Sequence, residues 1–196
     1  RYRNFEKLAE GGMGEVYRAE VLGIDNVNKV VAVKLIRADL MENPRFEQLF
    51  VQEVKISLTL SHANIVQVFD VGRINNRYFM SMEFVDGWTL TQVLKWCRQR
   101  GNLLPHKFAM FVAVEILKAL DYAHRRKDQE QTPLGLIHRD VSPSNILISR
   151  EGEVKLTDFG VSKSALTARF SNNNTIVGKA AYMSPEQRSG QSVDRK

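Results

Sequence analysis

The spacing of apolar residues predicts strands in the first part of the chain. Alternating or continuous apolar stretches, punctuated by Gly and Asn, predict strands over Glu15–Val21, Val30–Ile36, Ile65–Val71 and Tyr78–Phe84. One helix interrupts them. Asn43 and Pro44 form a cap and first-turn pair, and the apolar residues that follow keep helical spacing to about residue 61.

After Asp86 and Gly87 the pattern changes to helices. Apolar residues at helical spacing predict helices over Leu90–Arg100 and Lys107–Arg126. The second has its stripe at Phe108, Phe111, Val112, Glu115, Ile116 and Leu120. A mostly β part followed by a mostly α part indicates an α+β protein with two lobes, which we expect over residues 1–85 and 86–196.

The composition is that of a globular domain, because 43% of the 196 residues are hydrophobic and 26% are charged. This balance excludes a disordered or fibrous chain. The net charge of +6 would suit an acidic partner. Lys and Arg form no stripe interleaved with aromatic residues, however, so we expect a solvated basic face and no nucleic-acid partner.

The single cysteine, Cys97, excludes an internal disulfide and a zinc site built from cysteines, and we expect it on a helix. No apolar run approaches the ~18 residues that a membrane span needs, and the polar, basic start of the chain is unlike a signal peptide. We therefore expect a cytoplasmic domain, with any membrane tether in segments outside this sequence.

A glycine-rich turn lies between two strand-like stretches near the start of the chain. Gly11, Gly12 and Gly14 leave room for backbone N–H groups to approach phosphates. Glycine-rich hairpins are commonly no more than hairpins, and the Gly-Lys-Ser/Thr of a Walker A loop is missing. The turn alone therefore leaves nucleotide binding open.

Lys34 interrupts the apolar run Val30–Ile36 and shares a strand face with Ala32, where a buried ammonium requires an anion. Glu53 lies four residues after Leu49, on the apolar stripe of the predicted helix. A lone glutamate there could lie at the edge of the stripe and be solvated. Two opposite charges, each on the apolar face of its own element, instead predict a Lys34–Glu53 ion pair that holds Lys34 against an anion such as a nucleotide phosphate.

Two further motifs carry oxygen ligands. Asp140 and Asn145 lie five residues apart in a proline-containing loop before an apolar strand, and Asp158 follows thirteen residues after Asn145. Carboxylate and amide oxygens suit Mg²⁺, which combines a few protein ligands with phosphate oxygens. Each motif alone could be an ordinary turn.

Six motifs follow one another in a characteristic order. They are Gly14-Glu15-Val16, Val31-Ala32-Val33-Lys34, Glu53, His138-Arg139-Asp140 with Asn145, Asp158-Phe159-Gly160, and Ser184-Pro185-Glu186. Over its whole length the chain resembles the protein kinases, specifically the bacterial serine/threonine kinases of eukaryotic type. The resemblance implies a bilobal fold with an antiparallel β N-terminal lobe carrying one helix and a mainly helical C-terminal lobe. In the family several helices follow the last motif, so we expect an incomplete catalytic domain.

The resemblance also implies roles for individual residues. Asp140 would orient and deprotonate the substrate hydroxyl, and Lys34, held by Glu53, would contact the α- and β-phosphates of ATP. Asn145 and Asp158 would hold two Mg²⁺ ions. The loop positions that would cover the phosphates are Ala9, Gly11, Gly12 and Gly14. The adenine would contact the apolar positions Val16, Ala32 and Leu147, the gatekeeper Met82, and the hinge backbone of Glu83, Phe84 and Val85.

Four positions depart from the family pattern. Ala9 replaces a glycine, which predicts a stiffer loop, and Ser57 replaces a bulky apolar residue one turn after Glu53. Ser142 stands where a lysine is usual, and Lys179 where a threonine is usual. We expect Lys179 to supply the missing positive charge and Ser142 the bridging hydroxyl; the alternative is a solvent-facing Lys179 and a slow enzyme.

The predicted function is an ATP-dependent protein serine/threonine kinase that signals through protein substrates and autophosphorylates, with Ser171 and Thr175 as the expected sites. One alternative is a catalytically weak pseudokinase that acts as a nucleotide-binding switch or scaffold, which would have no need of Asp140. The other is a small-molecule kinase, which would generally lack the stretch 178–186.

Overall fold

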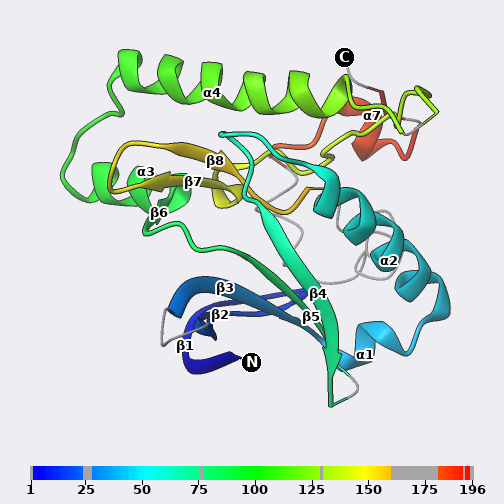
Figure 1. Cartoon of the computed structure of the whole chain (residues 1–196). Coiled ribbons are helices and arrows are strands. Elements are labelled where there is room, and N and C mark those ends of the chain that lie inside the picture. The colour runs from blue at the N-terminus through cyan, green and yellow to red at the C-terminus, as the bar shows by residue number, and fades with distance from the viewer. Residues whose placement is uncertain are drawn as a thin grey trace. The chain divides into compact units, whose positions relative to one another are not determined.

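The computed structural model describes residues 2–23, 28–75, 77–128, 130–159, 181–191, 193 and 194, without the side chains of Arg45, Leu49 and Glu53 (Figure 1). The chain forms two compact units. The first comprises Arg1–Ser61 and Val66–Val85, and the second comprises His62–Ile65 and Asp86–Lys196. The division of the chain into lobes with separate roles stays a prediction.

The first unit is built on an antiparallel five-stranded sheet with strand order β1-β2-β3-β5-β4. Its strands are β1 (Tyr2–Gly11), β2 (Gly14–Leu22), β3 (Asn28–Ile36), β4 (Val68–Ile74) and β5 (Arg77–Glu83), and its helices are α1 (Ala38–Met41) and α2 (Pro44–Thr59). The strand-like stretch expected before the glycine-rich turn is β1, whose bounds its polar pattern did not predict, and the single-turn α1 was not predicted at all.

The core of this unit follows from the two-residue period of β3. Val31 and Val33 pack with Ala19 of β2 and Phe79 of β5 in one buried cluster. Alternate residues of β3 lie on the opposite face of the sheet, so Lys34 falls outside this apolar cluster.

Helix α2 begins where its cap predicted. Asn43 Oδ1 accepts a hydrogen bond from Phe46 N at 3.4 Å, and its carbonyl accepts one from Glu47 N at 3.1 Å. The helix is tied to the sheet by Tyr78 of β5, whose hydroxyl donates to Glu47 Oε1 at 2.6 Å and whose ring lies 5.5 Å from that of Phe50. This hydrogen bond and the desolvation of the hydroxyl raise the pKa of Tyr78 above its ordinary value.

The glycine-rich segment is a tight hairpin between β1 and β2. Gly11 pairs with Gly14, and Gly12 and Met13 form the turn. Gly14 has a φ of +152°, and a Cβ there would lie 1.9 Å from the carbonyl oxygen of Leu35 in β3. No other residue type fits this position without moving the backbone of β3.

The second unit contains an antiparallel sheet with strand order β6-β7-β8. Its strands are β6 (Gly87–Thr89), β7 (Ile146–Ser149) and β8 (Val154–Leu156), and its helices are α3 (Leu90–Gln99), α4 (His106–His124), the 3-10 turn η2 (Pro143–Asn145) and α7 (Pro185–Arg188). Thr89 and Gln92 form a capping box at the start of α3, and Cys97 is buried on that helix, as predicted.

The predicted stripe of α4 needs one correction. The buried residues are Val112, Ile116, Ala119 and Ala123, whereas Phe111 is 44% exposed. These buried positions are three or four residues apart, as on one helix face. The prediction followed the large apolar side chain of Phe111 and overlooked the small alanines of this face.

The predicted strand Ile65–Val71 is shifted in the structure. Asn64 Nδ2 donates to Val154 O and to Glu115 Oε2, at 2.9 and 2.8 Å, and Leu156 N donates to Asn64 O at 2.8 Å. Ile65 forms a parallel bridge with Leu156. These contacts fix residues 64 and 65 on β8, so β4 begins only at residue 68.

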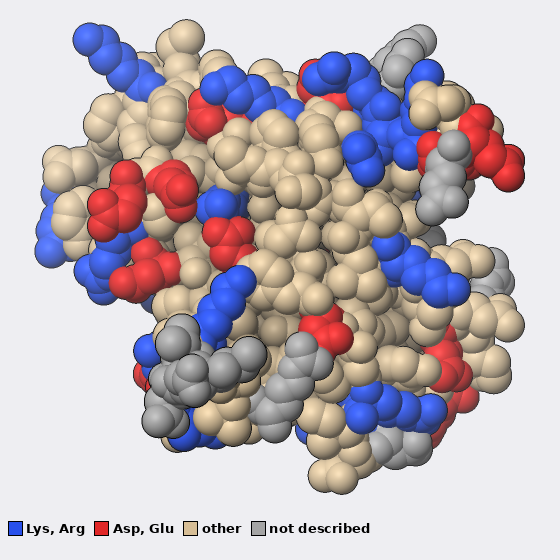
Figure 2. All heavy atoms as spheres, in the orientation of Figure 1, with Lys and Arg blue, Asp and Glu red and all other residues tan. Residues whose placement is uncertain are grey.

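The surface carries charges of both signs. On the face drawn in Figure 2, Lys and Arg are interspersed with Asp and Glu, and no continuous basic stripe crosses it. Residues 127, 128 and 130–133, which follow α4, are exposed. Among the described residues, no helix is long and apolar enough to cross a membrane.

The hairpin geometry predicts unequal effects of two neighbouring substitutions. Gly14→Ala should lower the free energy of unfolding by more than about 2 kcal/mol, because the left-handed φ and the contact with Leu35 O both oppose a side chain. Gly12→Ala, whose added Cβ meets nothing within 4 Å, should change it by less than about 0.5 kcal/mol. Chemical denaturation of both variants measures the difference, and equal losses would contradict this geometry.

Candidate active site

The first unit places Lys34 on β3 with 5% of its surface exposed. Its cross-strand partners are Val16 of β2 and Met80 of β5, so these side chains share one face of the sheet. Burial of the ammonium agrees with the prediction from sequence. Glu53 lies within α2, but its side chain is not among the described ones, so the Lys34–Glu53 pair stays a prediction.

The predicted adenine-contacting residues of this unit belong to the same face. Ala32 pairs with Met82, and both are more than nine-tenths buried. Val16 of β2 lies opposite Lys34, and Ala32 lies two residues before Lys34 on β3. The three side chains therefore lie on one face of the sheet. The sheet thus brings together Val16, Ala32 and Met82, which are at least sixteen residues apart in the sequence.

The hinge segment after β5 refines one prediction. Glu83 N donates to Gln67 O at 2.8 Å, and Glu83 Oε2 accepts from Gln67 N at 3.3 Å. The N–H group of Glu83 is therefore engaged within the protein. Of the predicted hinge contacts, Glu83 can contribute only its carbonyl, and the donor has to come from Val85 or Phe84.

Ala9 is accommodated without backbone strain. It pairs with Val16 at a register shift of β1, and its φ is not positive, so an L-residue adopts this conformation readily. At the tip of the hairpin, Met13 O accepts a hydrogen bond from Arg37 N at 3.0 Å. The departure from the glycine pattern at residue 9 therefore does not distort the hairpin.

In the second unit, the side chain of Asn145 hydrogen-bonds to Asp140. Its amide Nδ2 donates to the carbonyl oxygen of Asp140 at 2.9 Å and to the carboxylate Oδ2. Its backbone N donates to Ser142 O and its carbonyl accepts from Thr157 N, both at 2.9 Å. Since Nδ2 has only two protons and both point to Asp140, Oδ1 is the atom of this side chain that can face a cation.

His138 connects the two loops of this unit, a role that the sequence did not predict. It is 2% exposed, and its Nδ1 accepts a hydrogen bond from Asp140 N at 3.2 Å. Nδ1 therefore carries no proton, which assigns the proton to Nε2, 3.0 Å from the carbonyl oxygen of Thr157. The ring of Phe159 packs edge-on at 4.6 Å. The only signal in the sequence was the position of His138 two residues before Asp140.

Two residues of these loops have left-handed backbones. Arg139 has a φ of 61° and Asp158 a φ of 59°. Such non-glycine residues cost roughly 1–3 kcal/mol each. Arg139 O accepts a hydrogen bond at 2.8 Å from Gln187 Nε2 of α7, a helix capped by Ser184. The motif around residues 184–187 thereby contacts the residue next to Asp140.

Ser142 is buried, 3% exposed, and its Oγ lies 3.0 Å from Ser144 Oγ. Leu147 lies on β7, paired with Thr89 and Lys155. Other predicted residues lie outside the described part of the chain: Ser171, Thr175 and Lys179.

The donor set of this unit fits Mg²⁺. Asn145 offers an amide oxygen and Asp158 a carboxylate, oxygen ligands of the kind that Mg²⁺ takes in small number beside phosphate and water. Within the described ranges no three His, Cys, Asp or Glu side chains form a cluster for a metal held by protein alone.

The protein kinase domain family model matches residues 2–196. The chain is 34% identical over 190 residues to the tyrosine-protein kinase MasK of Myxococcus xanthus and 37% identical over 200 residues to the serine/threonine-protein kinase PknB of Mycobacterium tuberculosis. The serine/threonine-protein kinase PrkC of Bacillus subtilis is 33% identical over 190 residues. These matches cover 97%, 99% and 97% of this chain but 29%, 30% and 27% of the relatives, so the chain spans less than a third of their length.

A crystal structure of the PknI kinase domain of Mycobacterium tuberculosis matches with a TM-score of 0.73 and 26% sequence identity, covering 100% of this chain and 69% of that one. This likeness confirms the predicted α+β kinase fold. The family match over nearly the whole sequence, the solved structure of the same fold and the motifs in their expected order show that the chain belongs to the protein kinase family.

Proposed function

We propose that the protein transfers the γ-phosphate of ATP to serine or threonine hydroxyls of protein substrates. The observation that carries the proposal is Asp140, whose position is fixed through the backbone by His138 and through its side chain by Asn145. A module that only binds nucleotide has no need of a carboxylate held in this way. Nothing in the described part of the chain favours a pseudokinase.

Asp140 would accept the proton of the attacking hydroxyl and hold its oxygen in line with the γ-phosphate. Lys34 would orient the α- and β-phosphates, and Asn145 Oδ1 and Asp158 would hold the metal ions. Bound Mg²⁺ supplies charge neutralisation on the phosphate oxygens. Catalysis by this chain then consists of positioning and electrostatic stabilisation, without a covalent intermediate.

Serine/threonine specificity belongs to the proposal because relatives with both specificities match. PknB and PrkC are named serine/threonine-protein kinases, and MasK is named a tyrosine-protein kinase. Phosphoamino-acid analysis of the products, with a generic protein substrate and labelled ATP, distinguishes the two. Label on serine or threonine supports the proposal, whereas label on tyrosine alone would overturn it.

Asp140→Asn should reduce phosphate transfer by about 10²- to 10⁴-fold, the usual contribution of a general base. Asparagine keeps the shape and an acceptor for Asn145 Nδ2 but cannot take the proton, so nucleotide binding should persist. Asp121→Asn is the matched control, because Asp121 lies on the same unit, is exposed and pairs only with Arg125 among the ion pairs described. Transfer and nucleotide binding are measured on the same preparations; full turnover in Asp140→Asn would contradict the assigned role.

A second part of the proposal is that Ser142 and Lys179 have exchanged the roles of the lysine and threonine that are usual at these two positions. Lys179 would place its positive charge at the transferred phosphate, and Ser142, whose hydroxyl lies beside that of Ser144, would take the bridging part of the usual threonine. A preorganised cation at this point is worth about a hundredfold in rate.

Lys179→Thr and Ser142→Lys should each lower kcat, and the double variant should recover much of the loss, because together they restore the usual arrangement. Melting temperatures of all variants separate this coupling from unfolding, since Ser142 is buried. Additive losses in folded variants, or an unchanged kcat in Lys179→Ala, would show that Lys179 has no part in transfer.

A further inference from the structure

Two glutamates face each other across the glycine-rich hairpin. Glu10 of β1 and Glu15 of β2 are direct cross-strand partners, one step outside the Gly11–Gly14 pair. Like charges directly opposite each other destabilise a strand pair. Under the proposed function they also flank the turn that receives the phosphates of ATP, where further negative charge would oppose binding.

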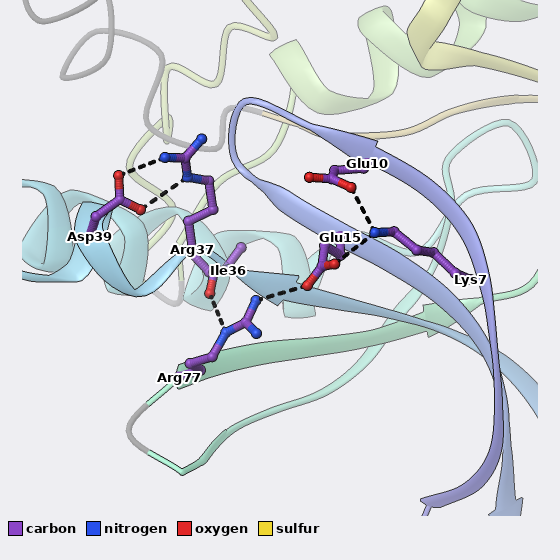
Figure 3. Close-up of polar contacts among 7 residues, drawn as sticks. All are labelled: Lys7, Glu10, Glu15, Ile36, Arg37, Asp39 and Arg77. Atoms are coloured by element: carbon purple, nitrogen blue, oxygen red, sulfur yellow. Dashed lines mark hydrogen bonds and ion pairs between the residues drawn. The ribbon is translucent and has the colours of Figure 1, made fainter.

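Lys7 joins these two carboxylates. Its Nζ lies 2.6 Å from Glu10 Oε2 and 2.8 Å from Glu15 Oε1, as Figure 3 shows. The hydrogen bond to Glu10 is the main cause that raises the pKa of Lys7. Hydrogen bonds from Lys7 and then Arg77 lower the pKa of Glu15, so the carboxylate is ionised at neutral pH.

Arg77 joins the hairpin to the rest of the sheet. From the start of β5, its Nη2 donates to Glu15 Oε2 and its Nε donates to Ile36 O, both at 3.2 Å (Figure 3). Ile36 ends β3 and is the cross-strand partner of Gly14. One planar guanidinium thus spans a carboxylate and a backbone carbonyl, a geometry that lysine cannot reproduce.

The side chain of the neighbouring Arg37 makes its described hydrogen bonds with Asp39, and its charge adds only a smaller Coulombic attraction to Glu10. Its guanidinium forms two hydrogen bonds with Asp39, at 2.9 and 3.0 Å. Arg37 and Arg77 lie near the same end of the sheet (Figure 3). They differ because the side chain of Arg77 hydrogen-bonds to Glu15 of the hairpin, whereas that of Arg37 hydrogen-bonds to Asp39.

We infer that Lys7, Glu10, Glu15 and Arg77 form a charge-balanced clasp that holds the glycine-rich hairpin in its phosphate-binding geometry, and that Arg77 is a positioning residue for nucleotide affinity. This inference rests on the proposed function. The four residues carry two positive and two negative charges, so the clasp cancels the repulsion between the glutamates and adds no net charge beside the phosphates. Because Arg77 lies on β5, the clasp fixes the hairpin relative to the sheet as well as internally.

Removing Arg77 should loosen the hairpin and weaken nucleotide binding without changing the chemical step. Exposed ion pairs contribute little individually, so Arg77→Gln should raise the Kd for MgATP and the KM for ATP by about fivefold, with kcat at saturating ATP unchanged. Arg77→Lys should restore only part of the affinity. Arg37→Gln removes the same charge but no hydrogen bond to the hairpin, so it should change both constants much less than Arg77→Gln.

A double-variant cycle tests the electrostatic part. Glu15→Gln in the Arg77→Gln background should recover much of the affinity, since it removes the carboxylate that Arg77 neutralises. Additive effects, or equal losses in Arg77→Gln and Arg37→Gln, would overturn the clasp.

Hydrogen exchange without nucleotide separates this inference from the proposed function. Arg77→Gln should speed exchange in the backbone of residues 8–18, and Arg37→Gln should not. If the wild-type protein binds no nucleotide, the proposed function fails while the exchange result still decides the clasp. Unchanged exchange in Arg77→Gln would overturn it whether or not nucleotide binds.

Discussion

The hydrogen bonds around His138 and Asn145 are the constraint on which the loop over residues 138–145 of the second unit depends. Arg139 and Asp158 hold left-handed backbones that cost roughly 1–3 kcal/mol each. Two hydrogen bonds of His138 and four of Asn145, at about 1 kcal/mol each, offset this cost. The cost of the two left-handed residues and the stabilisation by these hydrogen bonds are therefore of the same order. The loop keeps its shape only while this network is complete.

The first unit solves a different electrostatic problem. It buries Lys34, 5% exposed, within the apolar run of β3, and it brings two glutamates face to face at the end of the hairpin. A buried cation calls for an anion, and opposed carboxylates call for cations. On the proposed function, the phosphates of ATP and the predicted partner Glu53 supply the anions for Lys34. Lys7 and Arg77 supply the cations for the opposed glutamates.

The sequence predicted those elements whose period is strong and whose caps are explicit. The strand of Lys34, the helix that begins after Asn43, and the helices α3 and α4 were all found within a few residues of their predicted bounds. The polar strand β1 was expected before the glycine-rich turn but without bounds, since its extent follows from its pairing to β2 rather than from its own pattern. Ile65 was assigned to the wrong strand because its partner, Leu156, lies some ninety residues away.

The same limit applies to the site. Order and spacing singled out Asp140, Asn145 and Asp158 as candidates, because loop motifs are local in sequence. They could not show that the N–H group of Glu83 is engaged by Gln67, or that Arg77 of β5 reaches across β3 to Glu15 of β2. Those contacts depend on strand register, which a single sequence does not specify.

The protonation of His138 tests the account of the catalytic loop most directly. Nitrogen NMR of the protein labelled at histidine, with the signal assigned by its loss in His138→Gln, reports which ring nitrogen carries the proton. The account predicts a neutral ring protonated at Nε2 at pH 7, since Nδ1 accepts from Asp140 N and Nε2 donates to Thr157 O. A ring protonated at Nδ1, or at both nitrogens, would contradict it.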